Sequence, residues 1–420
     1  MSSTSADWPR TFSVGCGTEW TRATFSSTST STGTTTLTGD ACGPPPRVPM
    51  NTEAWHTVRH RLGALWVIAM CCAALYVNAL GGAFVADDLP AIVESPKAVR
   101  WRDVLSLFTG SWAASYGAFT YYRPISSLSL LLDYQLWGLN PVGYHLTNII
   151  LHAANAWLIC LILGALLGSQ RTALFAALLF AAHPVQTEAV TFASSRTDCL
   201  FALFYLAAVW CFLRSREADD TPRRRFLFWS LGFSALALMS KEMAISLPVV
   251  VVALDLTRGP DRGLLAIPRS LARQSPFFVV AALFVLLRSH ALGSMSLGGH
   301  GGGTWVERVV DMALTVATYL RLLCLPTNLY VDYHCVGPLT PLSLRGLAAV
   351  ALCAAMVVLT LRSRSRSPLI FLAGCLFIFG LGPTFLPSVP LRRMVAERHL
   401  YVPAIAAFAL AAWAFAKCRR

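Results

Sequence analysis

Long apolar segments, separated by short stretches rich in arginine, constrain this chain more than any other feature. Hydrophobic residues make up 55% of its 420 residues, and charged residues make up only 13%. An average soluble domain has about 25% charged residues. Inside a bilayer every backbone polar group has to be paired within the protein, so apolar segments of this kind cross it as helices. The composition therefore predicts an all-α, polytopic membrane protein.

We expect about ten transmembrane helices, counted as apolar segments that approach the roughly 20 residues needed to cross the hydrocarbon core. The predicted spans are residues 63–83, 145–168, 172–192, 198–213, 226–240, 243–256, 276–290, 346–361, 368–386 and 400–416. The third span has to continue through Pro184, where we expect a kink. Two further segments, 125–139 and 305–325, contain several polar residues and are predicted to be interfacial helices on the outer face.

Clusters of basic residues set the orientation of these spans. If all the predicted spans cross, the clusters fall on one side of the membrane, at positions 171, 214–225, 258–273, 362–366 and 417–420. The positive-inside rule identifies this side as cytoplasmic. Basic loops at the membrane then account for the formal net charge of +13, and nucleic acid is not expected as a partner. Three predicted loops lie on the opposite, outer side, at 84–124, 290–345 and 387–399.

The first 50 residues differ from the rest of the chain. They are rich in Ser, Thr and Gly and contain a Gly-Pro-Pro-Pro run near their end. A segment of this composition buries too little apolar surface to become ordered, and it lacks the apolar region of a secretory signal. We therefore expect a disordered Ser/Thr-rich tail at 1–50, followed by a multi-pass transmembrane domain at 51–420.

Ionisable residues inside or beside the spans collect on the predicted outer side. Such groups at membrane depth usually face a bundle interior or a water-filled cavity. The residues are Asp87, Asp88, Arg123, His183, Glu188, Arg196, Asp198, Lys241, Glu242, Glu397, Arg398 and His399. So many ionisable groups at one depth indicate a site that is open to the outer headgroup layer.

Each of these residues also has a purely structural interpretation. The acidic pair is equally explained as a solvated loop or as the N-cap of a helix, and Arg123 as a side chain that extends to the headgroups. His183 is also explained by hydrogen bonds to backbone groups that the following proline leaves unpaired. Arg196 and Asp198 are also explained as residues that pair elsewhere or only cap the fourth span. Lys241 and Glu242 are also explained as an exposed hairpin tip, and residues 397–399 as ordinary charges beside a span.

Short motifs around these residues follow one another in a fixed order along the chain. They are Phe84-Val-Ala-Asp-Asp-Leu-Pro-Ala-Ile-Val93, Tyr122-Arg-Pro-Ile125, Asn140-Pro-Val-Gly-Tyr-His-Leu-Thr-Asn-Ile-Ile-Leu-His-Ala153, His183-Pro-Val-Gln-Thr-Glu-Ala-Val190, Ser195-Arg-Thr-Asp198, Ser240-Lys-Glu-Met243 and Ala396-Glu-Arg-His-Leu-Tyr-Val-Pro403. Together they resemble the transmembrane and tetratricopeptide repeat-containing O-mannosyltransferases and their bacterial relatives, which have the GT-C glycosyltransferase fold. The resemblance covers residues 60–403.

The resemblance implies a GT-C-like helical bundle and a glycosyltransferase activity. Members of the family take a sugar, usually mannose, from a polyprenyl- or dolichyl-phosphate donor and attach it to Ser or Thr of proteins. The site would face the periplasm or the lumen of the endoplasmic reticulum, so the chain is expected in a bacterial inner membrane or in the endoplasmic reticulum membrane. The sequence leaves the sugar open, and also whether the acceptor is a polypeptide or a lipid.

The resemblance also implies roles for individual residues. The catalytic acidic pair of the family corresponds to Asp87 and Asp88, of which one would act as general base on the acceptor hydroxyl. The other would orient the acceptor or stabilise positive charge on the sugar. The residues expected to bind the phosphate or the sugar of the donor are Arg123, His183, Glu188, Arg196, Lys241, Glu242, Arg398 and His399.

No cofactor besides the lipid-linked sugar is called for by this scheme. The twelve cysteines show neither CxxC pairs nor the spacing of metal ligands, so no metal site is predicted. A divalent ion that bridges Asp87 and the donor phosphate stays open as an alternative.

Two expectations concern what surrounds the site. The family has a further span and tetratricopeptide repeats, which the sequence up to Arg420 does not contain, so we expect either a fragment or a separate partner that supplies the acceptor. The alternative function is that of a polytopic transporter or lipid flippase. Such proteins often show internal repeats and breaks at the middle of the membrane, and we see neither here.

Overall fold

The structure is a computed structural model that describes residues 52–94, 104–109, 115–116, 119–258, 265–292, 304–330, 333, 343–385 and 395–418. The tail expected at 1–50 lies outside these residues, and so do parts of the three predicted outer loops. From Glu53 onward the described helices belong to one structural unit.

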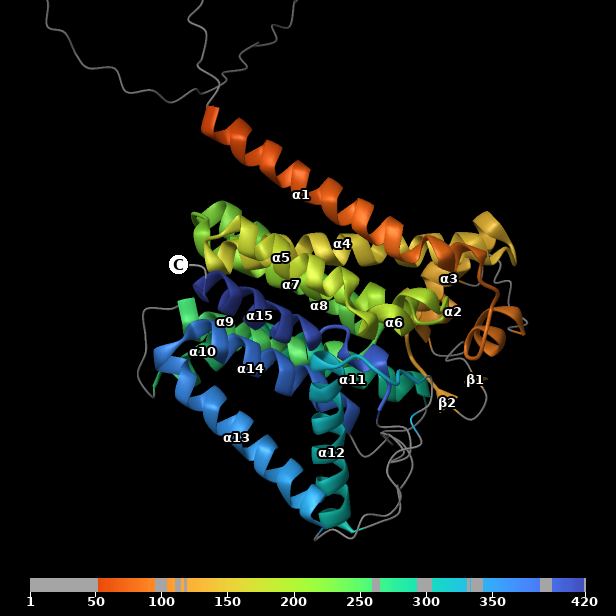
Figure 1. The fold of residues 1–420 in the computed structure, drawn as a ribbon. Helices are drawn as coiled ribbons and strands as arrows, with labels where there is room; N and C mark the ends of the chain where they lie inside the picture. The colour runs from red at the N-terminus through yellow and green to blue at the C-terminus, as the bar shows by residue number, and fades with distance from the viewer. Residues whose placement is uncertain are drawn as a thin grey trace, which may run out of the picture. The chain divides into compact units, whose positions relative to one another are not determined.

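The described part of the chain is built of α-helices (Figure 1). The longer helices are α1 (Thr52–Tyr76), α3 (Pro124–Trp137), α4 (Pro141–Leu167), α5 (Gln170–Ala182), α7 (Arg196–Glu217), α8 (Asp220–Ser240), α9 (Leu247–Arg258), α10 (Ala266–Arg273), α11 (Ser275–Leu292), α12 (Trp305–Cys324), α13 (Leu344–Arg366), α14 (Pro368–Leu381) and α15 (Ala404–Cys418).

Short elements connect these helices. They are α2 (Ser106–Thr109), α6 (Thr187–Thr191), η1 (Val77–Gly81), η2 (Leu89–Val93), η4 (Pro184–Gln186), η5 (Glu242–Ser246), η6 (Gly382–Phe385) and η8 (Glu397–Leu400). Among the described residues, strands occur only as a hairpin of two residues each, in which β1 (Ser115–Tyr116) pairs antiparallel with β2 (Phe119–Thr120). The predicted all-α, polytopic fold class is confirmed.

Each of the predicted spans contains a helix, although the helices differ in length. Among the described residues, 6 helices are long and apolar enough to cross a membrane unaided, namely those at Arg61–Gly81, Pro141–Leu167, Arg196–Glu217, Ser275–Leu292, Leu344–Arg366 and Pro368–Phe385. Helix α5 and the segment Pro184–Thr191 make a seventh if they count as one span, with a bend of 57°. The break falls at Pro184, as the sequence predicted. The predicted interfacial segments form α3 and α12, and neither meets the criteria of a span.

Local sequence signals account for where several helices begin and end. Asn140 caps α4, because its side-chain oxygen accepts a hydrogen bond from the backbone N–H of Val142 at 3.2 Å. Gly168 ends the same helix with a left-handed φ of 64°. At the start of α12, Thr304 and Glu307 form a reciprocal capping box.

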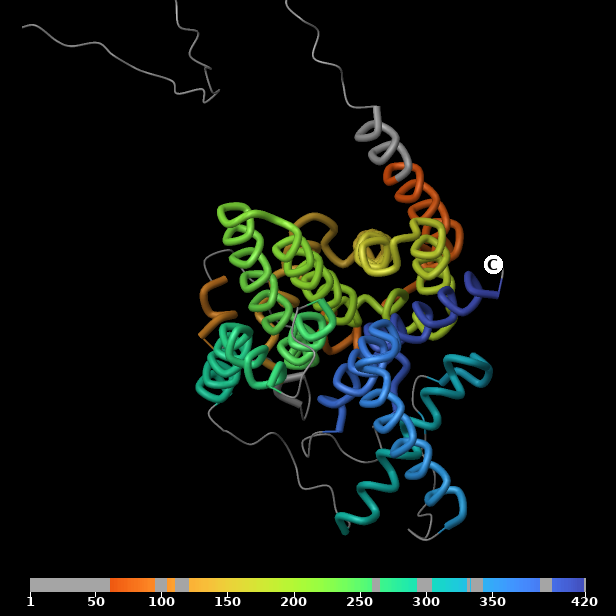
Figure 2. The backbone as a smooth tube through the Cα atoms, turned by 90° about the vertical axis from the view of Figure 1, so that its left-hand side faces the viewer, coloured from red at the N-terminus to blue at the C-terminus, as the bar shows by residue number. Residues whose placement is uncertain are grey.

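The central helices pack closely because small residues face their neighbours. Helix α7 packs along α8 and against α4, and α4 packs on α5 (Figures 1 and 2). Lipid tails are as apolar as leucine, so helices in a bilayer associate mainly by close packing. Along α5, Ala173, Ala176, Ala177 and Ala181 recur at helical spacing with no exposed surface. These alanines let α5 approach its neighbours closely.

A buried carboxylate organises the arginine-rich end of the bundle. Asp255, near the end of α9, is fully buried and accepts hydrogen bonds from Ser270 Oγ at 2.6 Å and Arg273 Nη2 at 2.8 Å. Both donors belong to α10. On α7, Arg216 Nη2 lies 3.4 Å from the other carboxylate oxygen. One buried acidic group thus attaches α10 to the ends of α7 and α9.

At the opposite end, Arg196 ties three helices together from a fully buried position at the start of α7. It forms an ion pair with Asp133 of α3. It also donates hydrogen bonds to Asn148 Oδ1 at 2.9 Å and to the carbonyl oxygen of Tyr144 at 2.8 Å, both on α4. Because a buried charge is expensive unless it is paired, these contacts hold α3, α4 and α7 in one arrangement.

The first prediction concerns this buried pair. We expect Asp133→Asn to lower the free energy of unfolding by about 3–5 kcal/mol, because it leaves the Arg196 charge buried and unpaired. Unfolding of the detergent-solubilised protein, followed by circular dichroism, measures the change. Glu217→Gln is the control: it removes a carboxylate that pairs with Arg214 at 2.6 Å but is 42% exposed, and such pairs contribute about 1 kcal/mol or less. Equal effects of the two substitutions would contradict the assignment.

Candidate functional site

Ionisable residues singled out in the sequence meet at the end of the bundle opposite Asp255, where ion pairs join them. The pairs link Arg398 to Asp87 and Glu188, Lys241 to Asp198, and Arg123 to Glu242. We call these residues the ion-pair cluster. They come from the segment after η1, the residue before α3, α6, the start of α7, the turn into η5, and η8. The fold therefore collects groups that are up to 311 positions apart in the chain.

The two neighbouring aspartates have different surroundings. Asp88 has no exposed surface, and its Oδ1 accepts a hydrogen bond from the backbone N–H of Ser194 at 2.7 Å. Its Oδ2 accepts from the backbone N–H groups of Val85 at 3.2 Å and Ala193 at 3.4 Å. The side chain of Asp87 is instead 67% exposed. The carboxylate of Asp88 thus holds the turn before α7, and the carboxylate of Asp87 faces solvent.

The backbone just before this pair has an unusual conformation. Ala86 has a φ of +47°, in the left-handed region that residues with a side chain seldom adopt. A tight turn follows, in which the backbone N–H of Asp88 donates to the carbonyl oxygen of Val85 at 2.9 Å. Strained backbone of this kind tends to occur at functional sites.

Arg398 connects the exposed aspartate to a buried glutamate. Its Nη1 lies 3.4 Å from Asp87 Oδ2 and 3.0 Å from Glu188 Oε1. Its backbone N–H also donates to Glu188 Oε2 at 2.9 Å. Burial alone would lower the pKa of Arg398, but the charges of Glu188 and Asp198 raise it above its usual value. The guanidinium therefore stays charged beside Asp87.

Lys241 is the most deeply buried cation of the cluster. Its Nζ lies 2.6 Å from Asp198 Oδ1, and the two side chains are only 5% and 1% exposed. Burial lowers the pKa of Lys241, and the Asp198 carboxylate offsets part of this effect. Removal of either partner would leave an uncompensated buried charge, so this pair ties α7 to the end of α8.

Arg123 is held by two hydrogen bonds to one carboxylate. Its Nε and Nη2 donate to Glu242 Oε2 at 2.9 Å and Oε1 at 2.6 Å, which is the paired geometry that guanidinium and carboxylate groups prefer. The guanidinium carbon also lies 4.2 Å from the centre of the Tyr121 ring. Burial alone would raise the pKa of Glu242, but the charge and hydrogen bonds of Arg123 outweigh it and lower the pKa to about 2. Glu242 therefore remains ionised at any physiological pH.

Three other predicted site residues have partners outside the ion-pair cluster. Arg196 is buried among the protein groups described above, which leaves no surface to receive a phosphate. His183 Nδ1 accepts a hydrogen bond from the backbone N–H of Val185 at 3.3 Å, the structural role that the following proline suggests. His399 Nδ1 lies 3.3 Å from the hydroxyl oxygen of Tyr319 on α12.

Polar residues of α4 to which the sequence analysis gave no role hold the segment that carries Arg398. On α4, Asn155 Nδ2 donates to the hydroxyl oxygen of Tyr401 at 3.1 Å, and His152 Nδ1 lies 2.7 Å from the same oxygen. Tyr401 directly follows η8, so these contacts fix the position of the segment that carries Arg398. The signal was present in the sequence: Asn148, His152 and Asn155 are polar residues at helical spacing within an apolar span.

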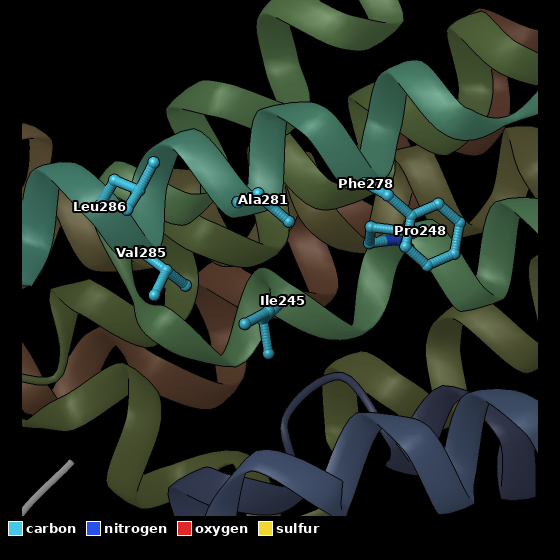
Figure 3. A pocket seen from close by; sticks show the side chains of 7 residues that line it. Ile245, Pro248, Phe278, Ala281, Val285 and Leu286 are labelled. Atoms are coloured by element: carbon cyan, nitrogen blue, oxygen red, sulfur yellow. The ribbon is translucent and has the colours of Figure 1, made fainter. Parts of the chain in front are cut away.

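An apolar groove is lined in part by η5, the short helix that also carries Glu242 of the cluster. It lies between η5, the start of α9 and α11, has a volume of about 450 Å³, and is lined by Ile245, Pro248, Phe278, Ala281, Ala282, Val285 and Leu286 (Figure 3). Ile245 belongs to the same short helix as Glu242. The side chain of Leu286 is 60% exposed, so the groove is open along its side. The groove and the ion-pair cluster thus share η5.

Among the described residues, no group of three or more His, Cys, Asp and Glu side chains is arranged to hold a metal ion. The carboxylates of the cluster are instead each in contact with an arginine or a lysine.

A family model described as dolichyl-phosphate-mannose-protein mannosyltransferase matches residues 124–292, which run from α3 to α11. Protein O-mannosyl-transferases are among the similar curated proteins. One from Mus musculus is 33% identical over 189 residues, which are 43% of this chain and 22% of that protein. One from Xenopus laevis is 38% identical over 188 residues, with the same two shares of 43% and 22%.

A third relative extends the similarity over most of the chain. A protein O-mannosyl-transferase of Caenorhabditis elegans is 25% identical over 405 residues, which are 90% of this chain and 54% of that protein. The chain thus spans between about a fifth and about half the length of these relatives. No solved structure matches it. These matches support the resemblance to the transmembrane and tetratricopeptide repeat-containing O-mannosyltransferases that the sequence motifs indicate.

Proposed function

We propose that the chain is a membrane glycosyltransferase that moves a sugar from a polyprenyl- or dolichyl-phosphate donor to a hydroxyl group. The observation that carries this proposal is the exposed carboxylate of Asp87 beside the guanidinium of Arg398, 3.4 Å away. A transfer of this kind needs a base for the hydroxyl and a cation for the departing phosphate, within reach of one sugar. The names of the relatives favour mannose as the sugar and a protein hydroxyl group as the acceptor, which we propose is that of a Ser or Thr.

Asp87 is the general base in this proposal. Its side chain is the accessible one of the acidic pair, so an acceptor hydroxyl has room to approach it. The hydroxyl oxygen attacks the anomeric carbon while Asp87 takes its proton. The bond from that carbon to the phosphate oxygen breaks, and the lipid phosphate leaves with the electron pair. A single displacement of this type inverts the configuration at the anomeric carbon.

Asp88 is a positioning residue in the same proposal. Its two carboxylate oxygens accept three backbone hydrogen bonds, from Val85, Ala193 and Ser194. These bonds fix the chain on either side of Asp87 relative to the turn that precedes α7. Hydrogen bonds to an ionised group are stronger than those between neutral groups. The Asp88 carboxylate therefore holds the two backbone segments together strongly.

The donor phosphate binds at the basic residues of the ion-pair cluster. Arg398 has the most exposed side chain of the three cations, at 30% against 18% for Arg123 and 5% for Lys241. An exposed guanidinium suits bidentate contact with a phosphate. Arg123 and Lys241 are each already paired with a carboxylate, and they contribute positive potential without direct contact with the phosphate.

The isoprenoid chain of the donor lies in the apolar groove between α9 and α11. The groove is lined by apolar side chains, opens to the side, and begins on η5, which also carries Glu242. A lipid with its phosphate at the cluster therefore has an apolar path for its chain. The arginines around the turn between α7 and α8 lie at the end of these two helices that is opposite Asp198 and Lys241. This supports a site on the lumenal or periplasmic face.

The second prediction tests the base. We expect Asp87→Asn to reduce transfer at least about 100-fold, the usual contribution of a general base, with no change in thermal stability because the side chain is exposed. Transfer from a polyprenyl-phosphate sugar to an acceptor peptide in proteoliposomes gives the rate. Glu94→Gln, an exposed carboxylate in the same loop, should leave the rate unchanged. Full activity of the Asp87 variant would rule out this base, and lipid flux without any glycosylated product would support the flippase alternative.

The third prediction separates the two aspartates. We expect Asp88→Asn to lower the free energy of unfolding by about 1.5–3 kcal/mol, because it weakens charge-assisted hydrogen bonds to buried backbone groups. Thermal unfolding of the Asp88 and Asp87 variants, measured side by side, should show a loss only for Asp88. If both variants unfold at the wild-type temperature, Asp88 does not position this loop.

The fourth prediction tests the groove. We expect Ala282→Phe to raise the KM for the donor about tenfold, equivalent to the burial of one or two methylene groups of the isoprenoid chain, and to leave kcat nearly unchanged. Leu283→Phe is a matched control, because Leu283 lies next to the groove residue on α11, is 54% exposed and does not line the groove. An unchanged KM in the Ala282 variant would show that the lipid chain lies elsewhere.

A further inference from the structure

Arg398 is shared between two carboxylates, unlike the other cations of the cluster. Lys241 and Arg123 each approach one carboxylate to 2.6 Å. Arg398 instead reaches Glu188 at 3.0 Å and Asp87 at 3.4 Å through the same nitrogen, Nη1. Its contact with Asp87 is the longest ion pair of the cluster. Arg398 is therefore the cation that most easily exchanges one of its carboxylate partners for another anion.

Among the described residues of the cluster, every cation already faces a carboxylate. Four carboxylates, from Asp87, Glu188, Asp198 and Glu242, face the three cations. A phosphate that binds here adds negative charge and has to take a cation from one of the carboxylates, because like charges in close contact repel strongly at low dielectric.

Among these carboxylates, Asp87 is the one that a phosphate displaces most easily. Glu188 is 5% exposed and receives both the guanidinium and the backbone N–H of Arg398, at 3.0 and 2.9 Å. Asp87 receives the guanidinium alone at 3.4 Å, and with 67% of its side chain exposed it is readily hydrated once released. Glu188 therefore keeps Arg398 in place while its contact with Asp87 is exchanged.

We propose that Asp87 and the donor phosphate compete for Arg398, so that binding of the donor releases Asp87 from its ion pair, while Glu188 positions the guanidinium throughout. This inference rests on the function proposed above and concerns the order of events at the same site. In the ion pair, the Asp87 carboxylate faces the guanidinium of Arg398. Asp87 thus becomes free to meet the acceptor hydroxyl only when the sugar donor is in place.

Competition of this kind is measured as binding, without any transfer reaction. We take farnesyl phosphate as the probe, titrated into the purified full chain in detergent by calorimetry. Asp87→Asn removes the competitor and should tighten binding about two- to fivefold, the range expected for a partly exposed ion pair. Arg398→Gln should weaken binding, and in the Arg398→Gln background Asp87→Asn should have no further effect. Such non-additivity is the signature of residues that act through one another.

Controls separate this coupling from a general change of charge. Glu94→Gln removes an exposed carboxylate seven positions from Asp87, and it should leave the affinity for farnesyl phosphate unchanged. The inference is overturned if Asp87→Asn does not tighten binding, or if it tightens binding equally with Arg398→Gln present. If the wild-type protein binds the probe and transfers sugar, but the variants show no coupling between Asp87 and Arg398, the competition alone is refuted. A wild-type protein that neither binds nor transfers refutes the proposed function as well.

Discussion

The pairing of buried charges is the interaction on which the rest of this structure depends. Arg196 with Asp133 and Lys241 with Asp198 are nearly or fully removed from solvent. In a low-dielectric bundle an unpaired charge is strongly unfavourable, so the helices that carry these groups have to meet at the same end. Helices α3, α4, α7 and α8 are thereby aligned, and the segments beside the helix ends that carry these charges are brought together. The ion-pair cluster is a consequence of this alignment.

Burial divides residues of identical chemistry into supporting and reactive groups. Asp87 and Asp88 are adjacent, yet the side chain of Asp87 is 67% exposed, whereas the buried carboxylate of Asp88 accepts hydrogen bonds from three backbone N–H groups. Arg196 and Arg398 are both arginines of the same region, yet only Arg398 retains exposed surface. In this arrangement, buried and fully paired charges surround charges that are accessible to solvent. The buried charges keep the accessible ones at fixed positions, which is what a transfer between two substrates requires.

The two ends of the bundle use the same device for different purposes. At one end, Asp255 is surrounded by Ser270, Arg273 and Arg216 and attaches a short helix to two long ones. At the other end, acidic and basic groups face each other without a central member, and Arg398 is divided between two carboxylates. The first arrangement has one stable pairing. The second has alternatives that lie close in geometry, and this makes it responsive to an added anion.

The sequence by itself determined the all-α membrane fold, the break at Pro184, the helical nature of segments 125–139 and 305–325, and a set of ionisable residues, several of which form ion pairs at one end of the bundle. Apolar length, proline and charge act locally, so they can be read from neighbouring residues. Only the tertiary structure decided which member of the acidic pair is exposed, that Arg196 is enclosed, and that Arg398 reaches both Asp87 and Glu188. These properties depend on contacts between residues as many as 311 positions apart. Local sequence signals carry no information about such distances, because burial and pairing are set by how the helices pack.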